Sequence, residues 1–107
     1  MVPTITFFGE KNRVLVYDIH NDDWEVKSLQ TKKGLEFHYY CSSVTLPSGE
    51  VLITGGGLSN DVYMFNPKKF TLKRKASMLR IRKEHSTVMI SGKVYALGGY
   101  DGEQAMF

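Results

Sequence analysis

The sequence predicts an all-β protein, and three observations support this prediction. The 107-residue chain is built from short apolar runs, and it lacks the longer i, i+3, i+4, i+7 pattern of an amphipathic helix. Six Tyr, six Phe and one Trp supply bulky side chains that suit a pleated surface. Ten Gly against three Pro indicate many tight turns. Because the gaps between runs are short and contain glycine, we expect antiparallel hairpins.

Nine strands are predicted, each an apolar run that ends at turn residues. In chain order they are Thr4–Phe8, Arg13–Tyr17, Trp24–Leu29, Tyr40–Leu46, Val51–Thr54, Asp61–Phe65, Phe70–Lys73, Ser86–Ile90 and Val94–Leu97. The connections Pro47–Glu50 and Ser91–Lys93 are expected to close two hairpins. Asn21–Asp23 resembles a calcium loop only superficially, since the glycine and the terminal glutamate of that loop are missing, and we interpret it as a turn.

The predicted strands repeat along the chain. Val51–Gly57 matches Val94–Tyr100 at an offset of 43 residues, and a degenerate copy of the same segment is Ile5–Glu10. Val14–Asp18 matches Val62–Asn66 at an offset of 48 residues. A period in the forties with four strands per unit is typical of a blade of a β-propeller.

The repeated unit resembles the kelch repeat. Met78, Arg82 and His85 have the spacing of the family's Met-x-x-x-Arg-x-x-His segment, and Gly98 and Gly99 match its diglycine. The positions that the resemblance assigns to the structural motif are Tyr17, Trp24, Gly55, Gly56, Met78, Arg82, His85, Tyr95, Gly98 and Gly99. The resemblance covers essentially the whole chain and implies antiparallel, four-stranded kelch blades.

The resemblance also implies a structural role for each of these positions. The diglycine ends the second strand of a blade near the propeller axis, where crowded backbones need the positive φ that glycine adopts easily. Tyr17 and Trp24 are expected to fill the wedge between neighbouring blades, and Arg82 is expected to bridge blades through bonds to carbonyl groups. The central unit departs from the pattern, because His38 and Cys41 stand where the family has Arg and His.

The blade assignment predicts an incomplete propeller. Residues 4–30 form a blade that lacks its first strand, residues 38–75 form a complete blade, and residues 82–107 begin a third. A closed propeller typically has 4 to 8 blades. We therefore expect either a fragment of a longer chain or several copies that assemble into a ring.

Catalytic, metal and cofactor sites are not expected. His20, His38 and His85 lack the spacing of metal ligands, and His85 occupies the repeat's structural position. Cys41 falls in a predicted innermost strand, where small residues line the channel. Gly55–Gly57 lacks the Lys-Ser/Thr and the helix of a phosphate loop.

Composition constrains the compartment and the class of partner. The single cysteine favours the cytoplasm, because it cannot form an internal disulfide. The sequence contains no run of the roughly 20 apolar residues that cross a bilayer, so no membrane association is expected. Net charge is only +3, and the basic cluster between Lys68 and Lys83 is interpreted as protection of an outer strand edge, so nucleic acid is not the expected partner.

The predicted function is non-enzymatic protein binding. In kelch proteins the loops between the second and third strands, and those between blades, form the partner surface. The residues expected there are Asn60, Asp61, Asp101, Glu103, Lys32, Lys33 and Arg80. The resemblance leaves open the substrate-recognition part of a ubiquitin ligase adaptor, a cytoskeletal scaffold, and a kelch-type oxidoreductase or isomerase.

Overall fold

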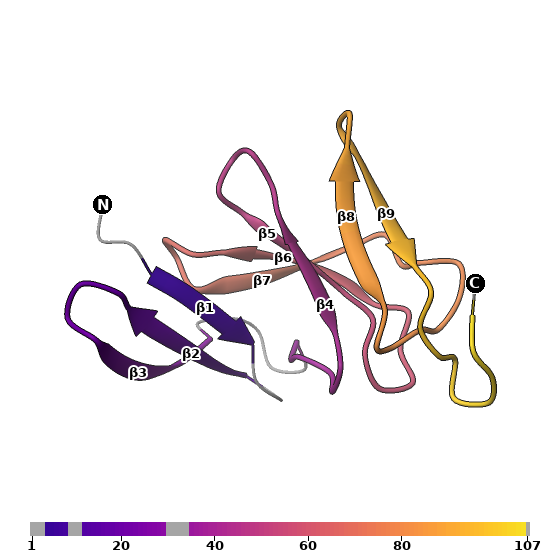
Figure 1. The fold of residues 1–107 in the computed structure, drawn as a ribbon, viewed down its shortest axis with the longest axis horizontal. Helices are drawn as coiled ribbons and strands as arrows, with labels where there is room; N and C mark the ends of the chain where they lie inside the picture. Colours follow the sequence, from indigo (N-terminus) through magenta and orange to yellow (C-terminus); the bar gives the residue numbers. More distant parts are fainter. Residues whose placement is uncertain (1–3, 9–11, 30–34, 107) are drawn as a thin grey trace.

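The computed structural model describes residues 4–8, 12–29 and 35–106, which form three sheets along the chain (Figure 1). All nine strands of these residues pair antiparallel, and each overlaps the range predicted for it. The described segments contain no helix, and therefore none that could span a membrane. The all-β prediction is confirmed.

The first sheet is three-stranded. Its strands, in order across the sheet, are β1 (Thr4–Phe8), β2 (Arg13–Asp18) and β3 (Asp23–Ser28). The β2–β3 turn forms because the carboxylate of Asp18 accepts hydrogen bonds from the backbone N–H of Asn21 at 3.1 Å and from its side-chain amide at 2.8 Å. Asp22 takes a positive φ of 50°, which Asp tolerates better than most residues. This segment is therefore a turn, as expected.

The central sheet is four-stranded, and its strands follow chain order. They are β4 (Ser42–Thr45), β5 (Val51–Thr54), β6 (Val62–Asn66) and β7 (Thr71–Lys75). Gly49 lies in the β4–β5 turn with φ of 92°. In the β6–β7 turn the side-chain oxygen of Asn66 accepts hydrogen bonds from the backbone N–H groups of Lys68 and Lys69, at 2.9 and 3.0 Å. Local turn chemistry therefore sets both hairpins.

The third sheet contains two described strands. They are β8 (Ser86–Ile90) and β9 (Lys93–Leu97). Ser91 and Gly92 join them, both with positive φ, which matches the twist of a two-residue hairpin loop. Beyond β9, Tyr100 forms isolated antiparallel bridges with Lys83 and with Ala105.

The apolar core lies between the first and central sheets. Its buried members are Val14, Leu29, Phe37, Ile53, Tyr63, Phe65 and Leu72. Phe65 is 1% exposed, and its ring lies 5.1 Å from that of Phe8 and 5.2 Å from that of Phe70, both edge to face. Burying a side chain of this size contributes about 1.5–3 kcal/mol. The first and central sheets are therefore stabilised by a common set of aromatic contacts.

The contact between the central and third sheets is polar and close. The hydroxyl of Thr54 shares hydrogen bonds with His85 Nε2 at 2.7 Å and with the Thr87 hydroxyl at 2.9 Å, and all three residues are buried. Gly55 permits this approach, because a Cβ there would lie 2.3 Å from the carbonyl oxygen of Arg82. Within the third sheet, a Cβ at Gly99 would lie 2.5 Å from the carbonyl oxygen of Lys83 and 2.8 Å from the Cβ of His85. Both glycines have positive φ.

The outer aromatic pair differs from its expected environment. The rings of Tyr17 and Trp24 lie 4.9 Å apart on paired strands, but Trp24 remains 54% exposed. The pair lies on the face of the first sheet that points away from the central sheet, since the opposite face contributes Phe8 and Val14 to the core. Among the described residues, no second blade covers this pair.

Candidate functional site: the loop surface

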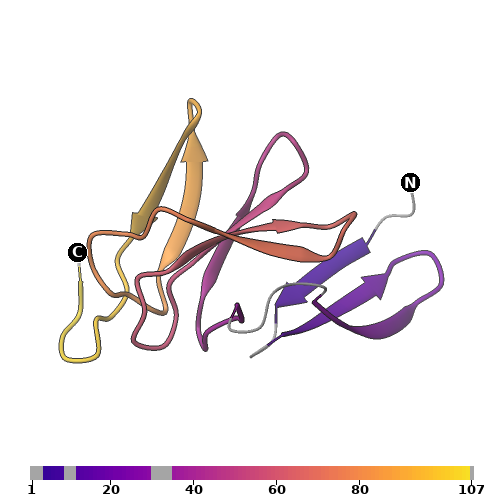
Figure 2. The same cartoon turned by 180° about the vertical axis from the view of Figure 1, so that it is seen from behind.

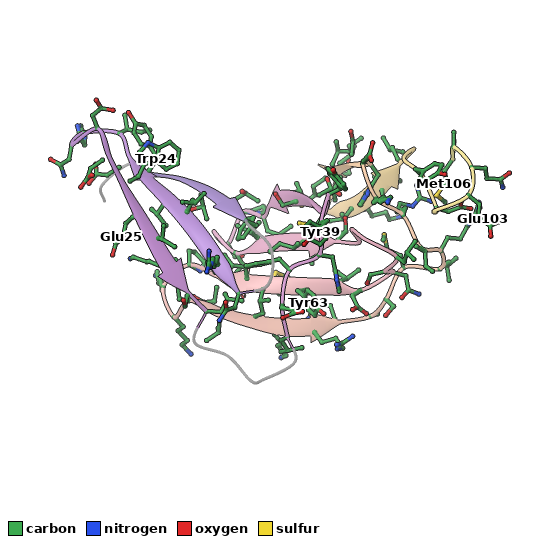
Figure 3. All side chains as sticks on the ribbon, turned by 90° about the horizontal axis from the view of Figure 1, so that it is seen from below. Trp24, Glu25, Tyr39, Tyr63, Glu103 and Met106 are labelled. Atoms are coloured by element: carbon green, nitrogen blue, oxygen red, sulfur yellow. The ribbon has the colours of Figure 1, made fainter. Side chains whose placement is uncertain are left out.

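Four connecting segments of the central and third sheets come together at one edge of the molecule. We call this edge the loop surface, and it comprises residues 38–41, 55–61, 76–84 and 98–105. Figure 1 shows these segments along the lower edge, opposite the β4–β5 and β8–β9 turns, and Figure 2 shows the same arrangement from behind. Figure 3 views the molecule from this edge, with Tyr39 near the middle and Glu103 at one end.

Backbone hydrogen bonds tie the loops to one another. Gly56 N–H donates to the carbonyl of Arg82 at 2.9 Å, and Gly57 N–H donates to that of Tyr39 at 2.6 Å. Lys83 and Tyr100 exchange both of their backbone hydrogen bonds at 2.9 Å. Because the Gly56–Arg82 bond joins the loop after β5 to the segment before β8, loops of the central and third sheets are held together rather than each loop standing alone.

Asn60 is hydrogen-bonded to Met78 within the chain. The side-chain amide of Asn60 donates a hydrogen bond to the backbone carbonyl of Met78 at 3.0 Å, and the backbone carbonyl of Asn60 accepts one from the Met78 N–H at 2.9 Å. The two bonds fasten the β5–β6 loop to the connection that leads to the third sheet. Asn60 therefore positions the loop surface, and its amide is already occupied.

Asp61, the next residue, lies at the centre of a polar cluster. Its carboxylate accepts hydrogen bonds from Arg74 at 2.8 Å and from the Tyr63 hydroxyl at 3.1 Å, and it lies 3.2 Å from His38 Nε2. The Arg74 guanidinium also lies over the Tyr63 ring, 5.4 Å from its centre.

These contacts decide the ionisation of Asp61. Partial burial raises the pKa of Asp61, but hydrogen bonds from His38 and Tyr63 and the nearby charge of Arg74 outweigh it and hold the pKa below its usual value. The Asp61 side chain is only 22% exposed, and its carboxylate is an internal anion shared by three donors. It supports the loop rather than presenting a free carboxylate.

Asp101 and Arg80 meet at the end of the loop surface. The Asp101 carboxylate accepts backbone hydrogen bonds from Glu103 and Gln104, each at 2.9 Å, and its other oxygen lies 3.5 Å from Arg80. The backbone bonds from Gln104 and Glu103 lower the pKa of Asp101, and the charge of Arg80 adds to this. Glu103 and Arg80 are both exposed. Lys32 and Lys33 lie outside the described residues.

The motif residues lie behind the loop surface. Arg82 donates to the carbonyls of Ala96 at 3.3 Å and Gly98 at 2.9 Å, which belong to its own third sheet. Its bridge to the central sheet is made instead by its backbone carbonyl, which accepts from Gly56. The Arg82 side chain was expected to link two blades; in the described residues it fastens the end of β9.

Tyr95 is a motif position that lies within a strand rather than in the loops. It lies in the middle of β9 opposite Val88 and is 44% exposed. Its side chain points away from the central sheet, since Thr87 on the other face contacts Thr54.

Sequence reasoning missed the apolar component of the loop surface. Leu79 is fully exposed, and Leu58 is 72% exposed. Tyr40 and Tyr100 are exposed as well, and the ammonium group of Lys83 lies between their rings, 5.9 and 5.8 Å from the ring centres. The signal available in the sequence was the presence of leucines inside loops that are otherwise polar.

The titratable groups of the loop surface bear on metal binding and nucleophilic chemistry through their positions and pKa values. Among the described residues no cluster of three or more His, Cys, Asp or Glu could hold a metal ion. Burial raises the pKa of the Cys41 thiol, which disfavours the nucleophilic thiolate.

Curated proteins similar to this chain carry one family name. Kelch-like protein 24 of Homo sapiens is 34% identical over 91 residues, which cover 84% of this chain and 14% of that protein. Kelch-like protein 35 of Mus musculus is 37% identical over 54 residues, covering 50% of this chain and 9% of that protein. Kelch-like protein 24a of Danio rerio is 36% identical over 55 residues, with coverages of 50% and 9%.

The relatives define the extent of the match as well as the family. No protein-family model matches the chain. The chain spans only a small part of the length of the curated relatives it matches. The diglycine geometry, the antiparallel four-stranded sheet and these relatives agree: the chain belongs to the kelch-repeat family of β-propeller proteins.

Proposed function

We propose that this chain is a non-enzymatic protein-binding module that contacts a partner protein through the loop surface. The observation that carries the proposal is the pair of exposed leucines, Leu58 and Leu79, on loops that are hydrogen-bonded to the scaffold. When a partner covers an exposed apolar side chain, the free energy of binding becomes more favourable by about 25 cal/mol per Å² of buried apolar area. Arg80 and Glu103 supply polar contacts at the rim.

The proposal includes the surroundings of the module. We assign residues 4–30, 38–75 and 82–107 to successive blades, with the rest of the ring supplied by further blades of a longer chain or by further copies. The cytoplasm is the proposed compartment, because the single cysteine cannot form an internal disulfide.

The test compares proteins crosslinked to the wild-type chain and to two variants, by quantitative mass spectrometry. Leu58→Asp with Leu79→Asp places two charges on the loop surface and is expected to remove the bound partner. Ser48→Asp, on the opposite β4–β5 turn, is the matched control and is expected to retain it. Equal recovery from the two variants contradicts binding at the loop surface.

A further inference from the structure

The connection between the central and third sheets contains an exposed serine in a basic segment. Ser77 follows the end of β7 and lies outside the strands. Its hydroxyl group makes no hydrogen bond to the described residues. Arg74 and Lys75 stand three and two residues before Ser77, and Arg80 stands three residues after it. Protection of the β7 edge accounts for the charges on the strand itself, but Ser77 and Arg80 lie beyond it.

The exposure of Ser77 is set with both of the sheets that this connection joins in place. Residues 76–85 lead from β7 of the central sheet to β8 of the third, and Figure 1 shows the connection between them. Asn60 holds the connection through two hydrogen bonds to Met78, at 3.0 and 2.9 Å. Ala76 and Ser77, on the β7 side of this anchor, are both exposed. A protein that approaches from solvent can therefore reach the Ser77 hydroxyl without opening a sheet.

Arginine and lysine shortly before a serine form the charge pattern that one class of protein kinase selects. The substrate cleft of these kinases carries carboxylates that pair with basic residues two and three positions before the serine. Arg74 and Lys75 occupy these positions, and no other serine or threonine of the chain has arginine three residues before it. The Arg74 side chain is 51% exposed, so its ion pair with Asp61 is of the partly solvated kind that exchanges partners at little cost.

We propose that Ser77 is a phosphorylation site for a serine/threonine protein kinase that selects basic residues before the serine. In the transfer, the Ser77 Oγ bonds to the γ-phosphorus of ATP as the bond from that phosphorus to the β,γ-bridging oxygen breaks. ADP leaves, and the hydroxyl proton passes to the catalytic carboxylate of the kinase. The product carries about −1.5 to −2 charges where the chain had a neutral hydroxyl. This inference is independent of partner binding at the loop surface.

Arg80 is the group that we expect the phosphate to capture. Its guanidinium is 57% exposed and lies 3.5 Å from the Asp101 carboxylate, at the outer limit of a hydrogen bond. Asp101 already accepts two backbone hydrogen bonds at 2.9 Å, from Glu103 and Gln104. A phosphate dianion offers Arg80 a stronger, charge-assisted contact. Phosphorylation is therefore expected to move Arg80 from Asp101 to the phosphate and to change the charge at the end of the loop surface.

The first test incubates the folded chain with ATP and the catalytic subunit of cAMP-dependent protein kinase, which prefers two basic residues before serine. Tandem mass spectrometry locates the phosphate, and initial rates give kcat/KM. We expect the phosphate on Ser77. Arg74→Gln and Lys75→Gln are each expected to lower kcat/KM about tenfold or more, because each removes a charge that the kinase cleft reads.

Lys69→Gln is the matched control for these variants. It removes an equally exposed basic side chain eight residues before Ser77, and it is expected to leave kcat/KM unchanged. Circular dichroism verifies that the variants fold, and Lys75→Gln keeps the comparison valid if loss of the Asp61 contact unfolds Arg74→Gln. A folded chain without phosphate on Ser77, or equal rates for Lys75→Gln and Lys69→Gln, overturns the proposal.

Phosphorus-31 NMR tests the contact with Arg80. The second pKa of phosphoserine is ordinarily about 6, and it is expected to be lowered in the phosphorylated chain because the guanidinium stabilises the dianion. Arg80→Gln is expected to return this pKa towards its ordinary value. Arg13→Gln, which removes an exposed arginine on β2, is the control and is expected to retain the lowered pKa. Identical titrations of the two phosphorylated variants would show that Arg80 does not hold the phosphate.

Discussion

At the scale of single residues, glycine decides how closely the central and third sheets approach. Gly55 of the central sheet faces the Arg82 carbonyl and the His85 ring, so a Cβ there would collide with the segment that leads into the third sheet. Gly99 faces the Lys83 carbonyl and His85 within the third sheet, and a Cβ there would collide too. The collision at Gly55 is with a backbone oxygen, which cannot rotate away as a flexible side chain could. The positive φ of both residues adds a second reason for glycine.

Gly55→Ala is expected to lower the free energy of unfolding by about 2–4 kcal/mol, because it combines overpacking with an unfavourable positive φ. Gly92→Ala is the matched control, since Gly92 has a φ of 79° but no atom within 4 Å of its added Cβ. The control is expected to lose only the conformational contribution, about 1–2 kcal/mol. Urea unfolding measures both values, and equal losses would contradict the steric explanation.

His85 makes stability depend on pH. Burial lowers the pKa of His85 below its ordinary value of 6.5, and the Arg82 charge lowers it further. Its Nδ1 is buried and has no hydrogen-bond partner among the described residues. The unfolded chain takes up the proton at His85 more readily than the folded chain does. The contribution of neutral His85 to the free energy of unfolding is therefore fully present above about pH 6.5. It is expected to decrease as the pH falls from there towards the lowered pKa.

The measurement is urea unfolding at a series of pH values from neutral to 5. His85→Gln cannot be protonated and is expected to show a smaller decrease in this range, even if it is less stable throughout. Asp18, Asp61 and Asp101 have pKa values lowered from 3.8, so their contributions are lost only at more acidic pH. An unchanged pH dependence in the variant would rule out His85 as its source.

At the scale of elements, two asparagines beside turns use their side chains in opposite hydrogen-bonding roles, one as a donor and one as an acceptor. The side chain of Asn60 donates a hydrogen bond to the Met78 carbonyl, whereas that of Asn66 accepts bonds from Lys68 and Lys69. An aspartate has nearly the same shape but can only accept when ionised. The two turns therefore respond differently to the same substitution.

Asn60→Asp is expected to lower stability by about 1–3 kcal/mol, because it replaces the donor by an acceptor facing a carbonyl oxygen. Asn66→Asp keeps both accepted bonds and is expected to change stability by less than about 0.5 kcal/mol. Thermal unfolding compares the two, and hydrogen exchange at Met78 reports whether the loop has opened. Equal effects of the two changes would show that the side-chain bond of Asn60 does not hold the loop.

The loop elements also show where prediction from the sequence stopped. Turn residues and apolar runs predicted all nine described strands, because both act over a few neighbouring residues. Asn60, Asp61 and Asp101 are predicted to face a partner, and the structure adds that their polar groups bond a neighbouring loop, strands of their own sheet and their own turn, respectively. Asn60 bonds a residue 18 positions away in the chain. A separation of that length gives no pattern in a single sequence.

At the scale of the whole molecule, aromatic contacts couple the first sheet to the central one. Phe65→Ala removes the ring that touches both Phe8 and Phe70, and its expected cost is about 3–5 kcal/mol. Trp24 lies on the first sheet and Phe65 on the central one, so Trp24 fluorescence reports whether the loss reaches the neighbouring sheet. We expect fluorescence and far-ultraviolet circular dichroism to shift to the same lower urea midpoint. Separate midpoints would show that the sheets unfold independently.

The sequence by itself determined the strand order, the hairpin turns and the kelch motif, because these depend on residue type and on spacing over a few positions. Tertiary structure alone decided which loop side chains are occupied and which are exposed. Asp61 and Leu79 make the contrast clear, since a charged residue became an internal acceptor and an apolar residue became fully exposed. Burial and hydrogen bonding are properties of neighbours in space, and Asp61 has one such neighbour, His38, 23 positions away in the sequence.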